Sequence, residues 1–136
     1  MADQDIREYL LQREPILMVD SLLEVSEKEA ETGLTLNADN FFVGEDGRIC
    51  ESGLVEHIAQ SASVLMGWNA RQRGEEAAVG YIGEVKKCRF EFLPQAGDTL
   101  RTRIRFLSEA MGVTLAAAET FVGDQLVVSC KLKISL

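Results

Sequence analysis

A carboxylate, an imidazole and a carboxamide lie close together in residues 51–68, a stretch whose other side chains are mostly apolar or small. They belong to Glu56, His57 and Gln60, and His57 is the only histidine of the chain. Carboxylates and imidazoles are the side chains that most often transfer protons in general acid–base catalysis. Because a buried polar group costs free energy unless it is hydrogen-bonded, each of the three needs either a structural partner or a chemical role.

The stretch that carries these residues predicts a long, buried helix. Leu54 and Ile58 begin an apolar face with helical spacing, and the stretch contains no proline. Ser52 is the expected N-cap, with Gly53 just inside the first turn. The helix is expected to end near residues 70–74.

Each of the three polar residues has two interpretations. Glu56 is either a site carboxylate or a structural one that hydrogen-bonds backbone amides. His57 is either catalytic or a satisfied core or interface histidine, and Gln60 is an orienting or structural amide. Because adjacent helix residues point about 100° apart, Glu56 and His57 cannot simply act as a pair within one subunit. In a dimer, however, His57 could reach the partner's site.

The segments around this helix predict an α+β fold in which a curved antiparallel sheet wraps one central helix. We expect a short helix over residues 5–11 and strands over residues 16–25, 29–36, 77–93, 99–108, 113–122 and 125–135. Gly80 and Gly83 predict a bend in the third strand. Short connections between the late strands indicate antiparallel pairing. Residues 1–136 should form a single domain, and a homodimer would cover the sheet edge and the exposed side of the helix.

Length, charge and cysteine content exclude several classes of partner and site. The 136 residues suffice for one core, and the formal net charge of -8 argues against nucleic acid and anionic membrane surfaces. No apolar run approaches the roughly 20 residues of a membrane helix, and residues 1–5 are too polar for a signal peptide. Cys50, Cys88 and Cys130 form no CxxC pair, so we expect no metal site, no disulfide framework and a reducing, cytoplasmic setting.

Three arginines, Arg101, Arg103 and Arg105, alternate with other residues and therefore share one face of the strand expected over residues 99–108. One interpretation is an ordinary solvated strand face. The other is a landing patch for an acidic carrier protein or for a phosphate group.

Three short phrases occur along the chain in a fixed order. Residues 11–20 read LQREPILMVD, residues 53–60 read GLVEHIAQ, and residues 89–98 read RFEFLPQAGD. Together they resemble the opening, helix and turn phrases of the 3-hydroxyacyl-(acyl carrier protein) dehydratases, a family with the hot-dog fold. The Glu-Asp-Gly sequence at residues 45–47, just before the helix, looks closest to the dehydratase-like members linked to aryl-polyene pigment clusters. The resemblance covers most of the chain.

The resemblance implies a reaction that needs two groups and no cofactor. A loop histidine removes the α-proton of a 3-hydroxyacyl thioester, and a helix carboxyl group helps the hydroxyl leave as water. Glu56 falls on that carboxyl group and Gln60 on the glutamine of the family. The N–H groups of Gly53 and Leu54 would hold the thioester oxygen, reinforced by the helix dipole. The implied partners are an acyl carrier protein or coenzyme A thioester and a homodimer or higher homo-oligomer, or a hetero-oligomer with another hot-dog chain.

The loop before the helix departs from the family pattern. The family reads Gly-His-Phe-Pro-Gly, whereas this chain reads Gly44, Glu45, Asp46 and Gly47, so Glu45 lies where the histidine is expected. A carboxylate there is either simply solvated or a substrate-contacting group that could act as a base.

Three functions therefore remain open for the chain. The first is a dehydratase that forms a 2-enoyl thioester with Glu56 as acid and base. The second is a hot-dog acyl thioesterase in which Glu56 activates water or attacks the thioester. The third is a catalytically degenerate acyl-binding or partner subunit, which the absence of the loop histidine favours.

Overall fold

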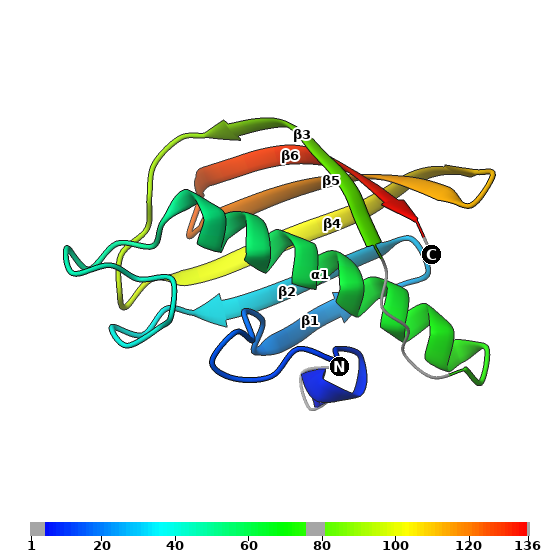
Figure 1. Ribbon diagram of the computed structural model, residues 1–136, viewed down its shortest axis with the longest axis horizontal. Coiled ribbons are helices and arrows are strands. Elements are labelled where there is room, and N and C mark those ends of the chain that lie inside the picture. The colour runs from blue at the N-terminus through cyan, green and yellow to red at the C-terminus, as the bar shows by residue number, and fades with distance from the viewer. Residues whose placement is uncertain (1–4, 76–80, 136) are drawn as a thin grey trace.

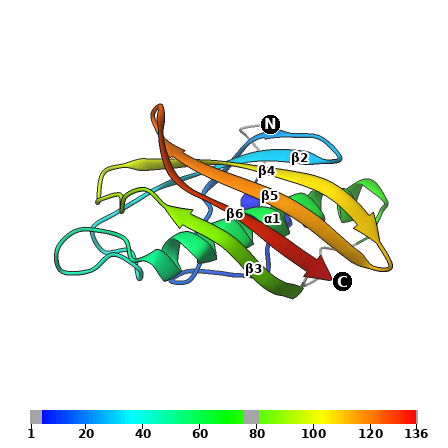
Figure 2. The ribbon, with the colours of Figure 1, turned by 90° about the horizontal axis from the view of Figure 1, so that it is seen from above.

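The computed structural model describes residues 5–75 and 81–135, and these form one long helix packed against a six-stranded antiparallel sheet (Figure 1). The elements are a 3-10 helix η1 (Ile6–Glu8), β1 (Ser21–Val25), β2 (Glu29–Thr35), α1 (Glu51–Gln72), β3 (Tyr81–Phe90), β4 (Thr99–Ala110), β5 (Val113–Val122) and β6 (Gln125–Ser135). The strand order is β1-β2-β4-β5-β6-β3, so β1 and β3 are the two edges of the sheet. Figure 2 shows the sheet curving over α1. The predicted α+β class with one central helix is confirmed.

The core fills the space between α1 and the sheet. Leu54, Ile58 and Leu65 of the helix have no exposed surface, and they belong to one cluster with Leu100 and Ile104 of β4. Burying each such side chain stabilises the fold by about 1.5–3 kcal/mol. Tertiary packing, more than intrinsic helix propensity, therefore holds α1 in place.

The helix begins two residues before the position expected from the sequence. Its N-cap is Cys50, not Ser52, and no side-chain capping bond is made. The Cys50 N–H donates to the carbonyl of Phe42 at 3.0 Å, so loop pairing continues up to this residue. The Cys50 carbonyl is the first helical acceptor, and the Ser52 hydroxyl lies 3.2 Å from the Cys50 sulfur instead of capping the helix.

Residues 16–20 were expected to begin a strand, but β1 starts only at Ser21. The prediction was wrong because the peptide groups around Met18 are hydrogen-bonded to helix side chains rather than to a neighbouring strand. The strand therefore starts after Asp20, whose carboxylate accepts a hydrogen bond from the Thr35 N–H at 2.9 Å.

The first turn of the chain is also shorter than expected. The helix predicted over residues 5–11 is only the 3-10 helix η1. The chain then turns Tyr9 and Leu10 into the core, and the Tyr9 carbonyl lies against α1 at Gly67, where any Cβ would collide with it. A longer helix would not allow this close approach.

The strand β3 contains two irregularities in its pairing with β6. One register shift lies between Ile82 and Glu84, which confirms the bend predicted at Gly83. The other lies between Lys86 and Arg89. The predicted bend at Gly80, and residues 77–80 of the expected strand, lie outside the described residues. No helix in the described part of the chain combines the length and the hydropathy needed to cross a membrane.

Candidate functional site

Gln60 is the centre of a hydrogen-bond network that joins α1 to the segment before β1. Its side-chain oxygen accepts from the N–H of Met18 at 2.6 Å, and its side-chain nitrogen donates to the carbonyl of Ile16 at 2.8 Å. The same nitrogen donates to Oε2 of Glu56 at 2.9 Å. Gln60 is fully buried, and its three hydrogen bonds decide which end of the amide is oxygen and which is nitrogen.

Glu56 is a half-buried carboxylate one turn before Gln60. Gln60 fixes its Oε2, and no hydrogen bond to its Oε1 comes from the described residues. Ser52, one further turn toward the helix start, lies on the same face because residues four apart are neighbours on a helix. A carboxylate that is oriented through one oxygen and free at the other can exchange a proton with a molecule bound at this face.

His57 points into the core between α1 and the sheet and is 0% exposed. Its Nδ1 lies 2.6 Å from the Met18 carbonyl oxygen, and its Nε2 lies 2.8 Å from the Thr102 hydroxyl. Because a carbonyl can only accept, the neutral ring carries its proton on Nδ1, and Nε2 accepts from Thr102. The Thr102 oxygen in turn accepts from the Thr120 hydroxyl at 2.6 Å. The hydrogen bonds therefore run in one direction, from Thr120 through Thr102 and His57 to Met18.

Burial lowers the pKa of His57 to about 4, although the hydrogen bond to Met18 and the charge of Asp20 act to raise it. A second ring proton would have to donate from Nε2 to the Thr102 oxygen, which would force the hydroxyl proton of Thr102 to find another acceptor. The ring is neutral in the folded protein near neutral pH. Both ring nitrogens are hydrogen-bonded within the chain, so neither is free to contact a substrate in this structure. The catalytic role of His57 stays a prediction.

The sheet side of this network is a row of buried threonines on three neighbouring strands. Thr32 of β2 pairs with Thr102 of β4, which pairs with Thr120 of β5. Thr32 contacts the Ser61 hydroxyl at 2.7 Å, and Ser61 donates to the carbonyl of His57 at 2.8 Å. The row thus satisfies the polar groups that the helix turns toward the core.

The protonation of His57 should make stability depend on pH. Histidine in an unfolded chain has a pKa of about 6.5. Between that pH and about 4, the unfolded chain therefore holds a proton that the folded chain does not. The free energy of unfolding should therefore fall as the pH falls through this window, by roughly 3 kcal/mol in total from this residue. Nitrogen NMR of the single imidazole checks the cause: the neutral Nδ1–H form should persist in the folded protein at pH about 5, while the urea-unfolded chain should titrate near about 6.5. A folded-state midpoint equal to the unfolded one would contradict it.

The start of α1 presents two free backbone N–H groups. Gly53 and Leu54, the predicted donors to a thioester oxygen, both donate to the Cys50 carbonyl, at 3.1 and 3.3 Å. The N–H groups of Glu51 and Ser52 have no acceptor among the described residues. The N–H groups that lack an acceptor in the described part of the chain are therefore two residues nearer the helix start than Gly53 and Leu54, whose role in holding a thioester oxygen stays a prediction.

A groove of about 520 Å³ lies beside this helix start and is lined by the preceding loop together with Ser52 and Leu93. Phe41 is 65% exposed on the loop, and its ring meets Phe42 edge-on with centroids 5.0 Å apart. The loop can pack this closely because Gly53 has no side chain: a Cβ there would lie 2.5 Å from the Cβ of Phe42. Gly53 therefore positions the groove wall.

Glu45 lies on an exposed turn of the same loop. The turn is closed by the Gly47 N–H, which donates to the Gly44 carbonyl at 3.0 Å, and by Asp46, which accepts from the Arg48 N–H at 3.0 Å. Glu45 is not part of the groove lining, and no hydrogen bond joins it to Glu56 in the described residues. A single chain does not bring the two carboxylates together, and a substrate contact by Glu45 stays a prediction.

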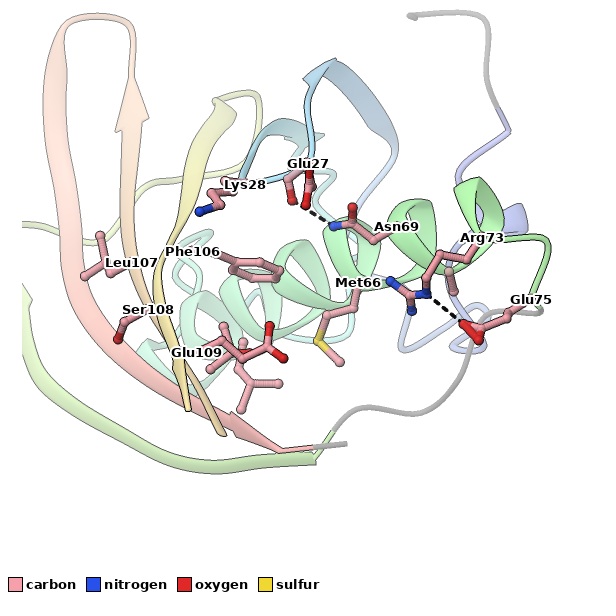
Figure 3. Close-up of a pocket in the computed structure, with 13 residues that line it drawn as sticks. Glu27, Lys28, Met66, Asn69, Arg73, Glu75, Phe106, Leu107, Ser108 and Glu109 are labelled. Atoms are coloured by element: carbon pink, nitrogen blue, oxygen red, sulfur yellow. Dashed lines mark hydrogen bonds and ion pairs between the residues drawn. The ribbon is translucent and has the colours of Figure 1, made fainter. Parts of the chain in front are cut away.

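A second cavity, of about 430 Å³, lies at the far end of α1 (Figure 3). Met66 and Phe106 line it, and the ion pair between Arg73 and Glu75, at 2.9 Å, lies beside it. Met66 lies ten positions after Glu56 on the helix, which corresponds to about 15 Å along the helix axis. The sequence also predicts an acyl tunnel along the helix, lined by residues such as Ile58, Leu65 and Met66. Met66 lines this cavity, whereas Ile58 and Leu65 are buried in the core, and the tunnel stays a prediction.

The arginine stripe of β4 is largely neutralised by neighbouring carboxylates. Arg101 and Arg103 lie 2.9 and 3.7 Å from Glu31, and Arg105 lies 3.9 Å from Glu119. This favours the interpretation of a solvated strand face. No group of three or more side chains that could hold a metal ion is found in the described residues.

The family model for ApeP-like dehydratases matches residues 4–135, almost the whole chain. The chain belongs to the ApeP-like dehydratase family. It is 31% identical to the 3-hydroxyacyl-[acyl-carrier-protein] dehydratase FabZ of Thermoanaerobacter pseudethanolicus, with 97% of this chain and 94% of that protein covered. The FabZ of Caldanaerobacter subterraneus is 30% identical, with 97% and 95% covered. The resemblance seen in the three sequence phrases is confirmed.

Solved structures place this ApeP-like chain in the hot-dog fold. The dehydratase heterocomplex ApeI:P from Xenorhabdus doucetiae matches with a TM-score of 0.89 at 20% identity, covering 97% of this chain and 90% of that one. A hypothetical thioesterase protein with coenzyme A from Streptococcus pneumoniae matches with a TM-score of 0.70 at 7% identity, covering 85% and 83%. At these identities the likeness concerns the fold alone.

Several hydrogen-bond partners of the helix residues in this ApeP-like chain were missed from the sequence. They are Met18, Ser61 and the buried threonines of the sheet. The sequence did contain a signal for a buried polar network. Thr102 and Thr120 fall on the apolar, inward-facing side of strands with alternating sequence, and the chain has a single histidine with apolar residues around it. Which inward hydroxyl meets that histidine depends on strand register, which sequence alone leaves open.

Proposed function

We propose that this ApeP-like chain binds an acyl thioester, a 3-hydroxyacyl group on an acyl carrier protein or coenzyme A, and takes part in its dehydration to the 2-enoyl thioester. Family membership supports the proposal, and so do the FabZ relatives, which are named as dehydratases of this substrate class. The observation that carries it is the Gln60–Glu56 hydrogen bond of 2.9 Å, because it orients a carboxylate beside a helix start with free N–H groups.

In the proposed reaction Glu56 gives a proton to the 3-hydroxyl as the carbon–oxygen bond breaks, and water leaves. A base takes the α-proton, and the electron pair of the broken carbon–hydrogen bond forms the double bond between the α and β carbons. The N–H groups of Glu51 and Ser52 stabilise the negative charge that develops on the thioester oxygen. Gln60 acts as a positioning residue, because all its polar atoms are already bonded within the chain.

The base in this proposal comes from a second hot-dog chain. His57 has both ring nitrogens bonded within its own chain, and Glu45 makes no contact with Glu56 there. The neighbour from Xenorhabdus doucetiae is named as a heterocomplex of dehydratases. We propose that this chain likewise assembles with another copy or another hot-dog chain, in the cytoplasm, where free cysteines such as its three are ordinarily kept reduced.

The second candidate function is acyl-thioester hydrolysis. The free oxygen of Glu56 favours it, because a lone helix carboxylate can activate water without help from a histidine. The third candidate, a non-catalytic partner subunit, would use the same groove only to bind.

The product of the reaction separates these functions. The full chain, alone and mixed with a second hot-dog dehydratase chain, is incubated with a 3-hydroxyacyl-carrier protein and followed by intact mass spectrometry. Loss of water from the acyl group supports dehydration, and release of the free carrier thiol supports hydrolysis. Turnover that is unchanged when this chain is added to the second chain would contradict both enzymatic functions.

A further inference from the structure

Two of the three cysteines meet across the pairing of β3 with β6. Lys86 pairs with Lys131 and Arg89 pairs with Ser129, so three steps along β3 match two steps along β6. The extra residue makes a β-bulge in which Lys87 and Cys88 together lie opposite Cys130, the residue between Ser129 and Lys131, and the Cys88 thiol is a close neighbour of the Cys130 thiol.

The bulge is held in an uncommon backbone conformation. Lys87, next to Cys88, has a φ of 55°, in the left-handed region that favours glycine. Such a conformation in a lysine costs free energy and is retained where the surrounding structure enforces it. Here it directs Cys88 onto the core, where the side chain packs as a partly buried residue.

The surroundings of the two thiols differ. Cys130 is 4% exposed inside the core, whereas Cys88 is only partly buried. Burial raises the pKa of Cys130 to about 12, and the neighbouring Cys88 adds to this effect. Neighbouring strands of a sheet lie about 4.7–4.9 Å apart, and a disulfide spans Cα separations of about 4.4–6.8 Å. Cys88 is thus the accessible thiol and Cys130 the sheltered partner beside it.

We propose that Cys88 and Cys130 form a reversible disulfide and that this pair is a redox-modification site on the edge strand β3. The thiolate of Cys88 attacks a small disulfide oxidant such as oxidised glutathione, which forms a mixed disulfide and releases one thiolate. Cys130 then attacks the Cys88 sulfur and expels the second thiolate, which takes up the Cys130 proton as it leaves. The two cysteines lose two hydrogen atoms and two electrons, and the oxidant becomes two thiols. Disulfides of cytosolic proteins are usually transient and redox-sensing in this way.

The disulfide would join an edge strand to the interior of the sheet. It would fix the bulge and so fix the shape of the edge that β3 offers to another strand. The site lies on a different element from Glu56, and the proposal does not depend on the proposed function.

Alkylation and mass spectrometry test the pair directly. The intact, full-length chain is incubated with oxidised glutathione, then unfolded in urea and blocked with iodoacetamide so that every remaining thiol is alkylated, digested and analysed. We expect a peptide in which Cys88 is linked to Cys130, which disappears after dithiothreitol treatment. Cys50, which is exposed at the helix start, is the internal control for oxidant access and should carry glutathione. The Cys50→Ser variant should give the same linked peptide as the wild type.

Two variants keep the proposal falsifiable. Cys130→Ser should convert the product at Cys88 into a lasting glutathione adduct, and Cys88→Ser should leave the buried Cys130 unmodified. The proposal is overturned if Cys88 and Cys130 are both recovered alkylated while Cys50 is fully modified. It is also overturned if the wild type accumulates the same lasting adduct at Cys88 as Cys130→Ser does.

Discussion

Replacing Glu56 by glutamine is expected to lower kcat/KM for turnover of a 3-hydroxyacyl thioester by about 10²–10⁴-fold, the contribution typical of a general acid or base. Glutamine has nearly the same shape and can still accept the hydrogen bond of 2.9 Å from Gln60, but it cannot exchange a proton at neutral pH. The free energy of unfolding should therefore change by only about 0.5 kcal/mol. Initial rates from mass spectrometry, together with a urea unfolding curve, separate these two effects.

The matched control for this variant is Glu29→Gln, which removes an exposed carboxylate at the start of β2. It should change neither the rate nor the stability. A Glu56→Gln protein that is folded and as fast as the wild type would exclude Glu56 from both enzymatic functions. A folded variant that still binds the thioester without turning it over would support the proposed role.

Replacing His57 by alanine is expected to lower the free energy of unfolding by about 3–5 kcal/mol. The variant leaves the Met18 carbonyl and the Thr102 hydroxyl without the ring that joins them, and each buried polar group left unpaired costs about 1–3 kcal/mol. The empty space left by the imidazole adds to this loss. Because the free energy of unfolding of a small domain is only about 5–15 kcal/mol, this loss would remove a large fraction of the stability.

Urea unfolding followed by circular dichroism measures this change, with Ser63→Ala as the control at a partly exposed position of the same helix. Ser63→Ala should stay within about 0.5 kcal/mol of the wild type. A His57→Ala protein of wild-type stability would show that the buried network does not hold the helix to the sheet. A variant of wild-type stability that has lost all turnover would instead favour a direct catalytic role for His57.

The fold could be predicted from the sequence because its signals are local and periodic. The apolar spacing of residues 51–68 and the alternation in the late strands each require only neighbouring residues to be recognised. The strands β5 (Val113–Val122) and β6 (Gln125–Ser135) have the predicted bounds. Glu56 and Gln60 are also one helical turn apart in the sequence, a spacing that puts two side chains on one face of a helix.

The errors concern groups whose partners are distant in the chain. Serine is a residue type preferred at the N-cap, which is why Ser52 was expected there. The pairing of Cys50 with Phe42 decides where the helix begins. Met18 lies in an apolar run typical of a strand, yet its N–H and carbonyl are bonded to side chains 42 and 39 residues away. No local pattern contains these contacts.

The hydrogen bonds from Thr120 to Met18 all run in one direction, so the contributions of these residues to the free energy of unfolding are coupled. Removing the His57 ring leaves the Thr102 hydroxyl without its acceptor. A second substitution, Thr102→Val, then removes a group that is already unpaired. The energies of Thr102→Val and His57→Ala should therefore fail to add, with the double variant less damaged than the sum by about 0.5–3 kcal/mol. Sequence variation in this protein would then tolerate replacement of the whole chain of groups by apolar residues more readily than replacement of any one of them.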